Sequence, residues 1–332
     1  MIERPLRIPQ ADSRTADFAL HTLRVVFMGT PDFAVASLDA LVQAGVQVVG
    51  VITAPDKPAG RGLHLHQSPV KVYAQQRGLS VLQPARLKAP EFLDALRALR
   101  ADLQVVVAFR MLPEVVWNMP RLGTINLHAS LLPLYRGAAP INWALINGEP
   151  YTGVTTFQLR HEIDTGDILM QERIPIGGDE TAGELHDRMK VIGSRLLVET
   201  VRGLAGGTLR RVPQQELEAN VKREGPLPQA PKLFTETCVI NWQLPVARVH
   251  NLIRGLSPYP GAYTLLDGKM LKIYRSHPQP AAPGVPAGQW ETDGKTYLRF
   301  ACPDGYIRVL ELQLEGKKRM PVQDFLRGYR PA

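Results

Sequence analysis

Between residues 23 and 28 the chain reads Leu23-Arg-Val-Val-Phe-Met28, an apolar run that is rich in β-branched residues and ends at Gly29. A run of this kind, bounded by a turn residue, predicts a buried strand. Apolar residues then recur at helical spacing from Ala34 until Gly45 ends the pattern. One strand followed directly by one helix is therefore the first structural unit that the sequence predicts.

The same alternation of strand and helix signals continues through the first 200 residues. Further strands are predicted at 46–53, 79–82, 103–109, 123–128, 154–159 and 168–176. Helices are predicted at 68–77, 90–99 and 181–204, and the last of these opens with the capping-box pattern Thr181-Ala-Gly-Glu184. Strands that alternate with helices of this length predict an α/β fold, in which a Rossmann-like, doubly wound parallel sheet carries helices on both faces.

The last third of the chain has a different pattern. Residues 211–231 are polar and proline-rich, which suits a linker. Short alternating runs follow, separated by turns such as Asp267-Gly268, and they predict a small β-barrel or a sandwich. We therefore divide the 332 residues into a flexible N-terminal extension (1–22), an α/β domain (23–207), a linker (208–230) and a C-terminal β-barrel domain (231–330).

Composition excludes several classes of protein. Two cysteines, Cys238 and Cys302, are too few for a disulfide framework or a four-thiolate zinc site, and they suit a reducing cytoplasm. No apolar run approaches the roughly 20 residues that cross a bilayer, so no membrane span is expected. Residues 1–22 lack the apolar stretch of a signal peptide, and their acidic residues argue against a transit peptide. The histidines show no metal-ligand spacing, so no metal is expected.

The formal net charge is +8, and most of the excess lies in the C-terminal third. Residues 226–332 contain 14 Lys and Arg but only 8 Asp and Glu. This imbalance favours a surface that holds a polyanion, while chemistry takes place in the nearly neutral front of the chain. Many soluble proteins are mildly basic without any such partner, so charge alone does not decide between the two interpretations.

The residues best suited to chemistry lie in the stretch Gly123-Thr-Ile-Asn-Leu-His-Ala-Ser-Leu-Leu-Pro-Leu-Tyr-Arg-Gly-Ala-Ala-Pro140. Asn126 and His128 are two apart on a predicted strand, so their side chains point to the same face at its carboxyl end. An amide beside an imidazole suits a carbonyl that becomes an oxyanion. A lone histidine at a strand end is more often a hydrogen-bonded structural residue. Asp164 and Asp167 are both candidates for a third group, and spacing does not choose between them.

Four motifs carry a resemblance to a known family: Asn126-Leu-His128, Ser130-Leu-Leu-Pro133, Tyr135-Arg-Gly-Ala-Ala-Pro140 and Asp164-Thr-Gly-Asp167. Together they resemble the signature of the 10-formyltetrahydrofolate-dependent formyltransferases. The resemblance implies that Asn126, His128 and Asp164 are catalytic, and so it selects Asp164 over Asp167. It also implies that 10-formyltetrahydrofolate is the co-substrate and that residues 23–207 are the catalytic domain. The segment that lines the folate site is then Ser130, Leu131, Leu132 and Pro133.

Two further segments resemble the members of this family that act on methionyl-tRNA. These are Phe27-Met-Gly-Thr-Pro-Asp-Phe33 and Ala54-Pro-Asp-Lys-Pro-Ala-Gly-Arg-Gly62. In those members the second segment is an inserted loop at the tRNA acceptor end, which implies that Lys57 and Arg61 contact tRNA. Glycines on both sides of Arg61 suit a loop that becomes ordered on a phosphate-bearing partner. From the residues alone, an ordinary solvated loop is the more common structure.

The C-terminal residues support the same resemblance. Ile240-Asn-Trp242 and Ile253-Arg-Gly-Leu-Ser-Pro-Tyr-Pro-Gly-Ala262 resemble the second domain of those members, a small β-barrel similar to an OB-fold. The basic balance of residues 231–330 is then explained by binding of the tRNA backbone. The run Lys317, Lys318 and Arg319 is a candidate tRNA contact, although three basic residues in a row are usually a solvated turn.

The activity implied is transfer of a formyl group from 10-formyltetrahydrofolate to the free amino group of methionyl-initiator tRNA, by a monomer in the cytoplasm. Asn126 and His128 are expected to stabilise the oxyanion by hydrogen bonds, and Asp164 to orient His128 and help remove the proton of the amine. At 109–113 this chain reads Phe109-Arg-Met-Leu-Pro113, where many members have a tyrosine-glycine pair. Arg110 is therefore expected to change the shape of the pocket. Two smaller departures from the family are Thr235 and Asn241.

Four other functions are considered. A formyltransferase for amino sugar nucleotides and a formyltetrahydrofolate hydrolase are disfavoured by the Arg61 loop and the basic C-terminal domain. A tRNA-binding module without activity does not need the three candidate catalytic residues. A nucleotide-dependent oxidoreductase is excluded because the turn after the first strand has one glycine, Gly29, where a dinucleotide fingerprint has three.

Overall fold

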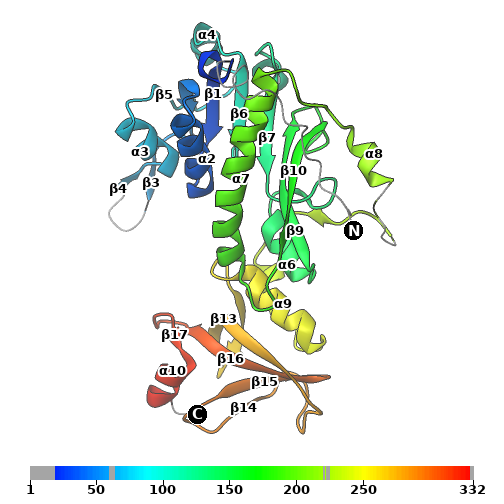
Figure 1. Ribbon diagram of the computed structural model, residues 1–332. Helices are drawn as coiled ribbons and strands as arrows, with labels where there is room; N and C mark the ends of the chain where they lie inside the picture. Colours follow the sequence, from blue (N-terminus) through cyan, green and yellow to red (C-terminus); the bar gives the residue numbers. More distant parts are fainter. Residues whose placement is uncertain (1–18, 60–63, 220, 222–224, 330–332) are drawn as a thin grey trace. The chain divides into compact units, whose positions relative to one another are not determined.

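The computed structural model describes residues 19–59, 64–219, 221 and 225–329, which form two compact units (Figure 1). The first unit contains the described residues up to Arg136, together with Gly153–Ile174 and Asp187–Pro228. The second contains Gly137–Thr152, Pro175–His186 and the described chain from Gln229 onward. Two short segments from the middle of the chain therefore pack with the C-terminal residues, so the units are not continuous in sequence as the predicted domains 23–207 and 231–330 are.

A seven-stranded sheet in the order β10-β9-β7-β6-β1-β2-β5 forms the centre of the first unit. β1 pairs in parallel with β2 and β6, β2 with β5, and β6 with β7, whereas β9 is antiparallel to β7. The predicted parallel sheet is thus confirmed for five strands, and β9 makes the whole sheet mixed. The strands are β1 (Arg24–Gly29), β2 (Gln47–Ile52), β5 (Val81–Leu82), β6 (Leu103–Val107), β7 (Thr124–His128), β9 (Tyr151–Gln158) and β10 (Ile168–Pro175).

Helices cover both faces of this sheet. Met28 and Val106, paired on β1 and β6, point to the face where α4 (Pro90–Ala98) and α5 (Glu114–Trp117) contribute side chains to one buried cluster. Leu127 points to the opposite face. There α7 (Ala182–Ala205), the long green helix of Figure 1, lies so close that a Cβ atom on Gly193 would be 3.0 Å from Leu127. The doubly wound arrangement that the sequence predicts is confirmed.

Local signals set the ends of the helices. α2 (Asp32–Gln43) begins directly after β1, and a Cβ atom on Gly29 would lie 2.6 Å from that of Ala34, so this tight turn requires glycine. The hydroxyl of Ser68 accepts a hydrogen bond from the Lys71 amide at 3.1 Å and caps α3 (Pro69–Gln76). Thr181 and Glu184 exchange backbone-to-side-chain hydrogen bonds of 2.9 and 3.3 Å, which confirms the predicted capping box before α7.

The predicted loop between residues 54 and 71 contains a short antiparallel hairpin. Its strands are β3 (Lys57–Ala59) and β4 (His64–His66), in which Lys57 pairs with His66. The base of the hairpin is anchored by an ion pair of 2.5 Å between Lys71 Nζ and Asp56 Oδ2. Lys71 is therefore engaged within the unit, whereas Arg61 lies outside the described residues.

The polar segment predicted as a linker at 208–230 packs against the first unit through its first half. Val212 and Ile168 exchange backbone hydrogen bonds of 2.8 and 2.9 Å. α8 (Gln214–Glu218) follows, and Gln214 is fully buried. The polar composition of this segment suggests a linker because a residue such as Gln214 is buried only where it finds hydrogen-bond partners. Those partners come from distant parts of the chain, so the local sequence does not reveal them.

Little of the predicted N-terminal extension falls within the described residues. Residues 19–22 form a helical turn in which Leu20 is buried, and His21 Nδ1 lies 3.1 Å from the Gly45 carbonyl oxygen. The predicted flexible residues 1–18 lie outside the described part of the chain. No helix in the described ranges, α7 included, is both long and apolar enough to cross a membrane.

The second unit is a six-stranded antiparallel half-barrel in the order β12-β13-β16-β15-β14, with β17 paired to β16. The predicted turn Asp267-Gly268 joins β12 to β13, and both of its residues have positive φ. The strands are β12 (Ala262–Leu266), β13 (Lys269–Pro280), β14 (Trp290–Thr292), β15 (Leu298–Cys302), β16 (Gly305–Leu314) and β17 (Met320–Pro321). The remaining elements that lie wholly within this unit are α6 (Pro140–Ile146), β11 (Gln229–Ala230), the 3₁₀ helix η1 (Glu236–Cys238), α9 (Val246–Leu256) and α10 (Val322–Gly328), while β8 (Arg136–Gly137) lies where the chain first enters it.

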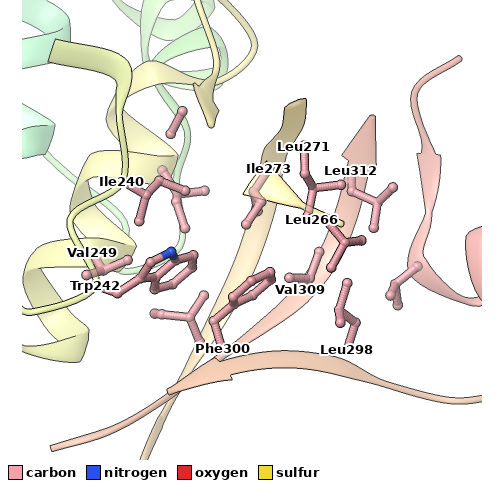
Figure 2. Close-up of a cluster of buried hydrophobic side chains, with 14 of the residues drawn as sticks. Ile240, Trp242, Val249, Leu266, Leu271, Ile273, Leu298, Phe300, Val309 and Leu312 are labelled. Atoms are coloured by element: carbon pink, nitrogen blue, oxygen red, sulfur yellow. The ribbon is translucent and has the colours of Figure 1, made fainter. Parts of the chain in front are cut away.

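One aromatic pair forms the centre of the second unit's core (Figure 2). The rings of Trp242 and Phe300 are stacked, with centroids 4.5 Å apart and planes 7° apart. Aliphatic side chains from the strands and from α9 surround the pair. The indole N–H donates a 3.0 Å hydrogen bond to the Thr264 hydroxyl, so Trp242 is buried without an unsatisfied polar atom.

Truncation of this aromatic pair should destabilise the second unit strongly. Phe300→Ala removes a fully buried ring, so we expect its free energy of unfolding to fall by about 3–5 kcal/mol. Denaturant unfolding followed by circular dichroism measures the loss. Leu265→Ala, at a position that is 63% exposed, is the matched control and should change stability little. Equal losses for the two variants would contradict the assignment of the core.

A buried histidine should make the stability of the second unit sensitive to acid. His250 Nδ1 lies 3.0 Å from Ser276 Oγ, and Nε2 lies 3.2 Å from Asp179 Oδ1. Burial lowers the pKa of His250 below its ordinary value of 6.5. The unfolded chain therefore binds more protons just below that pH, so stability that is present above pH 6.5 is lost as the pH falls through it.

We expect urea unfolding at stepped pH to show this loss for the native chain and a weaker pH dependence for His250→Gln. His161→Gln, at an exposed position in the first unit, should keep the native pH dependence. If His250→Gln lost stability on acidification as steeply as the native chain, another group would have to be responsible.

Candidate active site

The carboxyl end of β7 brings two of the three predicted catalytic residues to one face of the sheet. Asn126 pairs with Val106 of parallel β6 and with Phe157 of antiparallel β9. Side chains alternate along a strand, so Asn126 and His128 point to the same face, as the spacing predicts. Asn126 is half-buried and His128 is 7% exposed. An amide that is partly open to solvent therefore lies beside a buried imidazole.

Two oxygen atoms flank the imidazole of His128. Nε2 lies 2.9 Å from the backbone carbonyl oxygen of Tyr135, and Nδ1 lies 3.9 Å from Oδ2 of Asp164. A carbonyl oxygen only accepts hydrogen bonds, so Nε2 carries the proton of the neutral ring and its N–H donates a hydrogen bond to the Tyr135 carbonyl. Nδ1, the nitrogen that faces the carboxylate, is then left to accept a proton. The imidazole is thus oriented by the loop that follows its own strand.

The geometry of the site distinguishes Asp164 from Asp167, between which the spacing of residues in the sequence does not choose. Asp164 is half-buried, at ion-pair distance from His128. Asp167 instead accepts a 2.6 Å hydrogen bond from the guanidinium of Arg160. Asp164 has a φ of +55°, in the left-handed region that few residues other than glycine adopt. The backbone turn at residue 164 thus directs one carboxylate towards the imidazole, while the other is engaged elsewhere.

The predicted folate segment lies inside the first unit. Residues Ser130 to Pro133 are all buried, and the Ser130 hydroxyl donates a 2.7 Å hydrogen bond to the Leu134 carbonyl. The side chains of Ser130, Leu131, Leu132 and Pro133 therefore shape the loop from within. A ligand beside this segment would meet a loop whose backbone is already immobilised.

Two buried polar side chains that the sequence analysis did not identify hold this loop. Thr155 of β9 accepts a hydrogen bond from the Leu132 amide at 3.2 Å and donates one to the Ser130 carbonyl at 2.6 Å. Gln171 of β10 donates to the Leu132 carbonyl at 2.7 Å and to the Thr155 hydroxyl at 3.0 Å. Their only signal in sequence is a polar residue at a buried position of an apolar strand, which does not reveal its partner.

Arg110, where this chain departs from the resembled family, binds backbone rather than extending freely. Its guanidinium donates to the Ala85 carbonyl at 3.0 Å and also to the Pro84 carbonyl. It lies over the ring of Phe109 at 5.6 Å from the centroid. Arg110 therefore joins the loop after β6 to the loop after β5.

The predicted tRNA contacts differ in what their side chains bind. Lys57, in the β3–β4 hairpin, is exposed. Lys317 and Lys318, in the second unit, are exposed as well. Arg319 instead forms two hydrogen bonds, of 2.7 and 2.6 Å, with the carboxylate of Glu311, which holds the pKa of the guanidinium above its usual value. It also lies 4.3 Å from the centroid of the Tyr274 ring. Its charge is used within the unit, unlike those of the two lysines.

Comparison with known proteins identifies the family. Residues 23–201 match the formyl transferase family model, and residues 232–330 match the model of the formyl transferase C-terminal domain. The methionyl-tRNA formyltransferase of Bacteroides fragilis is 55% identical over 92% of this chain and 95% of its own length. That of Parabacteroides distasonis is 57% identical over 93% of this chain and 96% of its own length.

Solved structures share the fold at much lower identity. A sugar 3N-formyl transferase, WlaRD, has a TM-score of 0.64 and 19% identity over 90% of this chain and all of its own. HypX from Aquifex aeolicus, solved with tetrahydrofolic acid, has a TM-score of 0.61 and 17% identity over 93% of this chain and 48% of its own. These two show the fold alone. Because the family model covers most of the first unit's sequence and the curated relatives are more than half identical over nearly their whole length, the chain belongs to the methionyl-tRNA formyltransferase family.

Proposed function

We propose that this chain transfers the formyl group of 10-formyltetrahydrofolate to the free amino group of methionyl-initiator tRNA, with Asn126, His128 and Asp164 as its catalytic residues. The product is N-formylmethionyl-tRNA, which serves translation initiation. The observation that carries the proposal is the arrangement of His128 between the Tyr135 carbonyl and the Asp164 carboxylate, with Asn126 on the same face of β7. An acyl transfer to an amine needs these two functions, a proton acceptor and a hydrogen-bond donor to an oxyanion.

Asn126 supplies the donor. When the amine attacks the formyl carbon, a C–N bond forms and the carbonyl oxygen gains negative charge. The amide NH₂ group of Asn126 donates a hydrogen bond to that oxygen. Asn126 is half-buried, so the bond forms in a setting where water screens it less than in bulk solvent.

His128 and Asp164 supply the proton acceptor. The Tyr135 carbonyl holds the proton of the neutral ring on Nε2, so Nδ1 accepts the proton that the attacking amine loses. The ring then becomes a cation, and the Asp164 carboxylate 3.9 Å away stabilises it. When the tetrahedral intermediate collapses, its C=O bond re-forms and the bond between the formyl carbon and the folate nitrogen breaks. That nitrogen takes up the proton held by the imidazolium, and tetrahydrofolate leaves. His128 is thus the proton acceptor in this proposal, whereas from the sequence we expect it to donate a hydrogen bond to the oxyanion.

The residues around the predicted folate segment hold it in a fixed conformation before any co-substrate binds. Thr155 and Gln171 satisfy the amide of Leu132 and the carbonyls of Ser130 and Leu132, so the loop does not reorganise its backbone to bind. One structural relative, the formyltransferase from Helicobacter canadensis, was solved with folinic acid. Preorganisation of this kind lowers the entropic cost of binding.

The tRNA partner accounts for the distribution of charge. Most of the net charge of +8 falls in residues 226–332. Lys57 in β3 and Arg61, which lies outside the described residues, add to it. We assign the exposed residues Lys57, Lys317 and Lys318, together with Arg61, to phosphates of the tRNA. Every residue invoked comes from one chain, so the proposal needs only a monomer. The substrate places the reaction in the cytoplasm, where the two free cysteines, Cys238 and Cys302, are compatible with a reducing environment.

Removing either the donor or the base should abolish most of the activity without unfolding the chain. We expect Asn126→Ala to lower kcat/KM by about 10²–10³, because one oxyanion donor is lost. His128→Ala should lower it by about 10²–10⁴, because the proton acceptor is lost. Initial rates with 10-formyltetrahydrofolate and methionyl-tRNA measure both effects.

His161→Ala is the matched control, since His161 is exposed in the same loop as Asp164. It should retain native turnover. Near-native rates for Asn126→Ala and His128→Ala would overturn the catalytic assignment. Parallel reactions with an amino sugar nucleotide and with water as acceptors test the two alternatives, and formylation of the sugar alone would overturn the choice of substrate.

Charge reversal at the exposed lysines should weaken tRNA binding in a salt-dependent way. For the double variant Lys317→Glu and Lys318→Glu, we expect the slope of log Kd for tRNA against log salt to fall by about 1–2, because each phosphate contact contributes roughly 0.7–0.9. Binding titrations at several salt concentrations measure the slope. Lys295→Glu, at an exposed position between β14 and β15, controls for the effect of a charge reversal on the overall electrostatic field of the protein. It should change the slope less than the double variant does. An unchanged slope in the double variant would remove these lysines from the interface.

A further inference from the structure

Gln214 is a fully buried polar residue in the segment whose sequence reads as a linker. It begins α8, and its side chain reaches back to the loop that carries Asp164. Nε2 donates hydrogen bonds to the backbone carbonyls of Asp164 at 2.8 Å and of Gly166 at 2.9 Å. One amide group therefore holds both ends of the turn from which the Asp164 side chain projects.

The turn held by Gln214 is also confined on its other side. A Cβ atom on Gly166 would lie 1.6 Å from the Gln158 carbonyl oxygen, so this residue must be glycine for the loop to approach β9. Asp164 itself adopts a φ of +55°, in the left-handed region, which aspartate tolerates better than most residues other than glycine. The Gly166 contact sets how close the loop lies to β9, and the two hydrogen bonds from Gln214 set the direction of its carbonyls. The position of the Asp164 carboxylate follows from both.

The other end of the Gln214 amide binds the loop that orients His128. Oε1 accepts hydrogen bonds from Arg136 Nε at 3.0 Å and from Nη2 at 2.5 Å, and Nη2 also pairs with Glu218 at 2.8 Å. Arg136 directly follows Tyr135, whose carbonyl holds His128 Nε2. The amide can sit in only one orientation, since its oxygen must face a guanidinium and its nitrogen must face two carbonyls.

We propose that Gln214 is a positioning residue that sets the geometry of the His128–Asp164 pair, by joining the Tyr135–Arg136 loop to the Asp164–Gly166 loop. The inference rests on the catalytic roles proposed above for His128 and Asp164. Gln214 does not touch the reacting atoms, so it acts only through where it holds these two residues. A displacement of a catalytic group by about 1 Å is enough to cost roughly 10²-fold in rate.

Gln214→Glu tests the proposal with almost no change of shape. The carboxylate still accepts from Arg136, but it no longer donates to the carbonyls of Asp164 and Gly166. We expect kcat to fall by about 10–100-fold, while KM for tRNA and for the folate stays within about twofold, because only the catalytic geometry changes. Gln215→Glu adds the same charge at the exposed neighbouring position and should keep native kcat. A native kcat for Gln214→Glu overturns the proposal.

A double variant tests whether Gln214 acts through Asp164. If it does, Gln214→Glu combined with Asp164→Asn is no slower than Asp164→Asn alone, because the carboxylate to be positioned is already gone. Losses that multiply overturn the proposal. The single variant Asp164→Asn tests the proposed function separately, since native activity there removes the catalytic role of Asp164 whatever Gln214 does.

Gln214→Met provides a second route if the buried charge of the glutamate variant prevents folding. It removes the two donors without adding charge and keeps a similar volume. Circular dichroism and thermal unfolding of the full chain establish that each variant is folded before its rates are compared. The same loss of kcat at constant KM supports the proposal, and a rise of both KM values with native kcat overturns it.

Discussion

The hydrogen-bond ladders on both sides of β7 are the constraint on which the candidate site depends. β6 pairs with this strand in parallel and β9 pairs with it antiparallel, so its backbone cannot rotate. The alternation of side chains then places Asn126 and His128 on one face, at the end of the strand where open α/β sheets bind ligands. Leu127, between them, is committed to the opposite face and packs against α7. The chemistry on one face and the helix packing on the other are thus set together.

The loops that complete the site depend on a second constraint, the need to satisfy buried backbone groups. A loop that runs inside the unit leaves carbonyls and amides without water, and each must find a partner. Thr155 and Gln171 meet this need for residues 130–132, and Gln214 meets it for residues 164–166. Thr155 comes from β9, which is next to β7, Gln171 comes from β10 one strand further out, and Gln214 comes from a segment 50 positions after Asp164. Rigid placement of His128 and Asp164 is therefore shared among distant parts of the sequence.

In the second unit, the residues that stabilise the fold are different from the residues that carry its positive charge. Its core is apolar and centred on the stacked rings of Trp242 and Phe300. Most of its basic side chains are exposed or half-buried, whereas Arg254 is buried and donates a hydrogen bond to the Gly177 carbonyl. These basic residues are not equivalent. Arg319 is paired with Glu311 and stacked on Tyr274, while Lys317 and Lys318, on the same turn, are exposed. A count of positive charges in the sequence therefore overestimates those available to a polyanion.

Much of the fold and part of the site follow from the sequence by itself. The alternation of strands and helices predicts the doubly wound sheet, and the spacing of Asn126 and His128 predicts that they share a face, because both depend on periods of the local backbone. Four short motifs indicate the family, because they keep those residues at fixed spacings. Spacing does not choose between Asp164 and Asp167, and the choice comes from the resemblance to the family. The tertiary structure shows that Asp164 faces His128 while Asp167 pairs with Arg160. It alone decides that Arg319 is paired with Glu311 and that Gln214 is buried and hydrogen-bonded to the Asp164 loop. In each of these cases the deciding partner lies far away in sequence or on a loop without a regular period, so its identity depends on which residues the fold brings into contact.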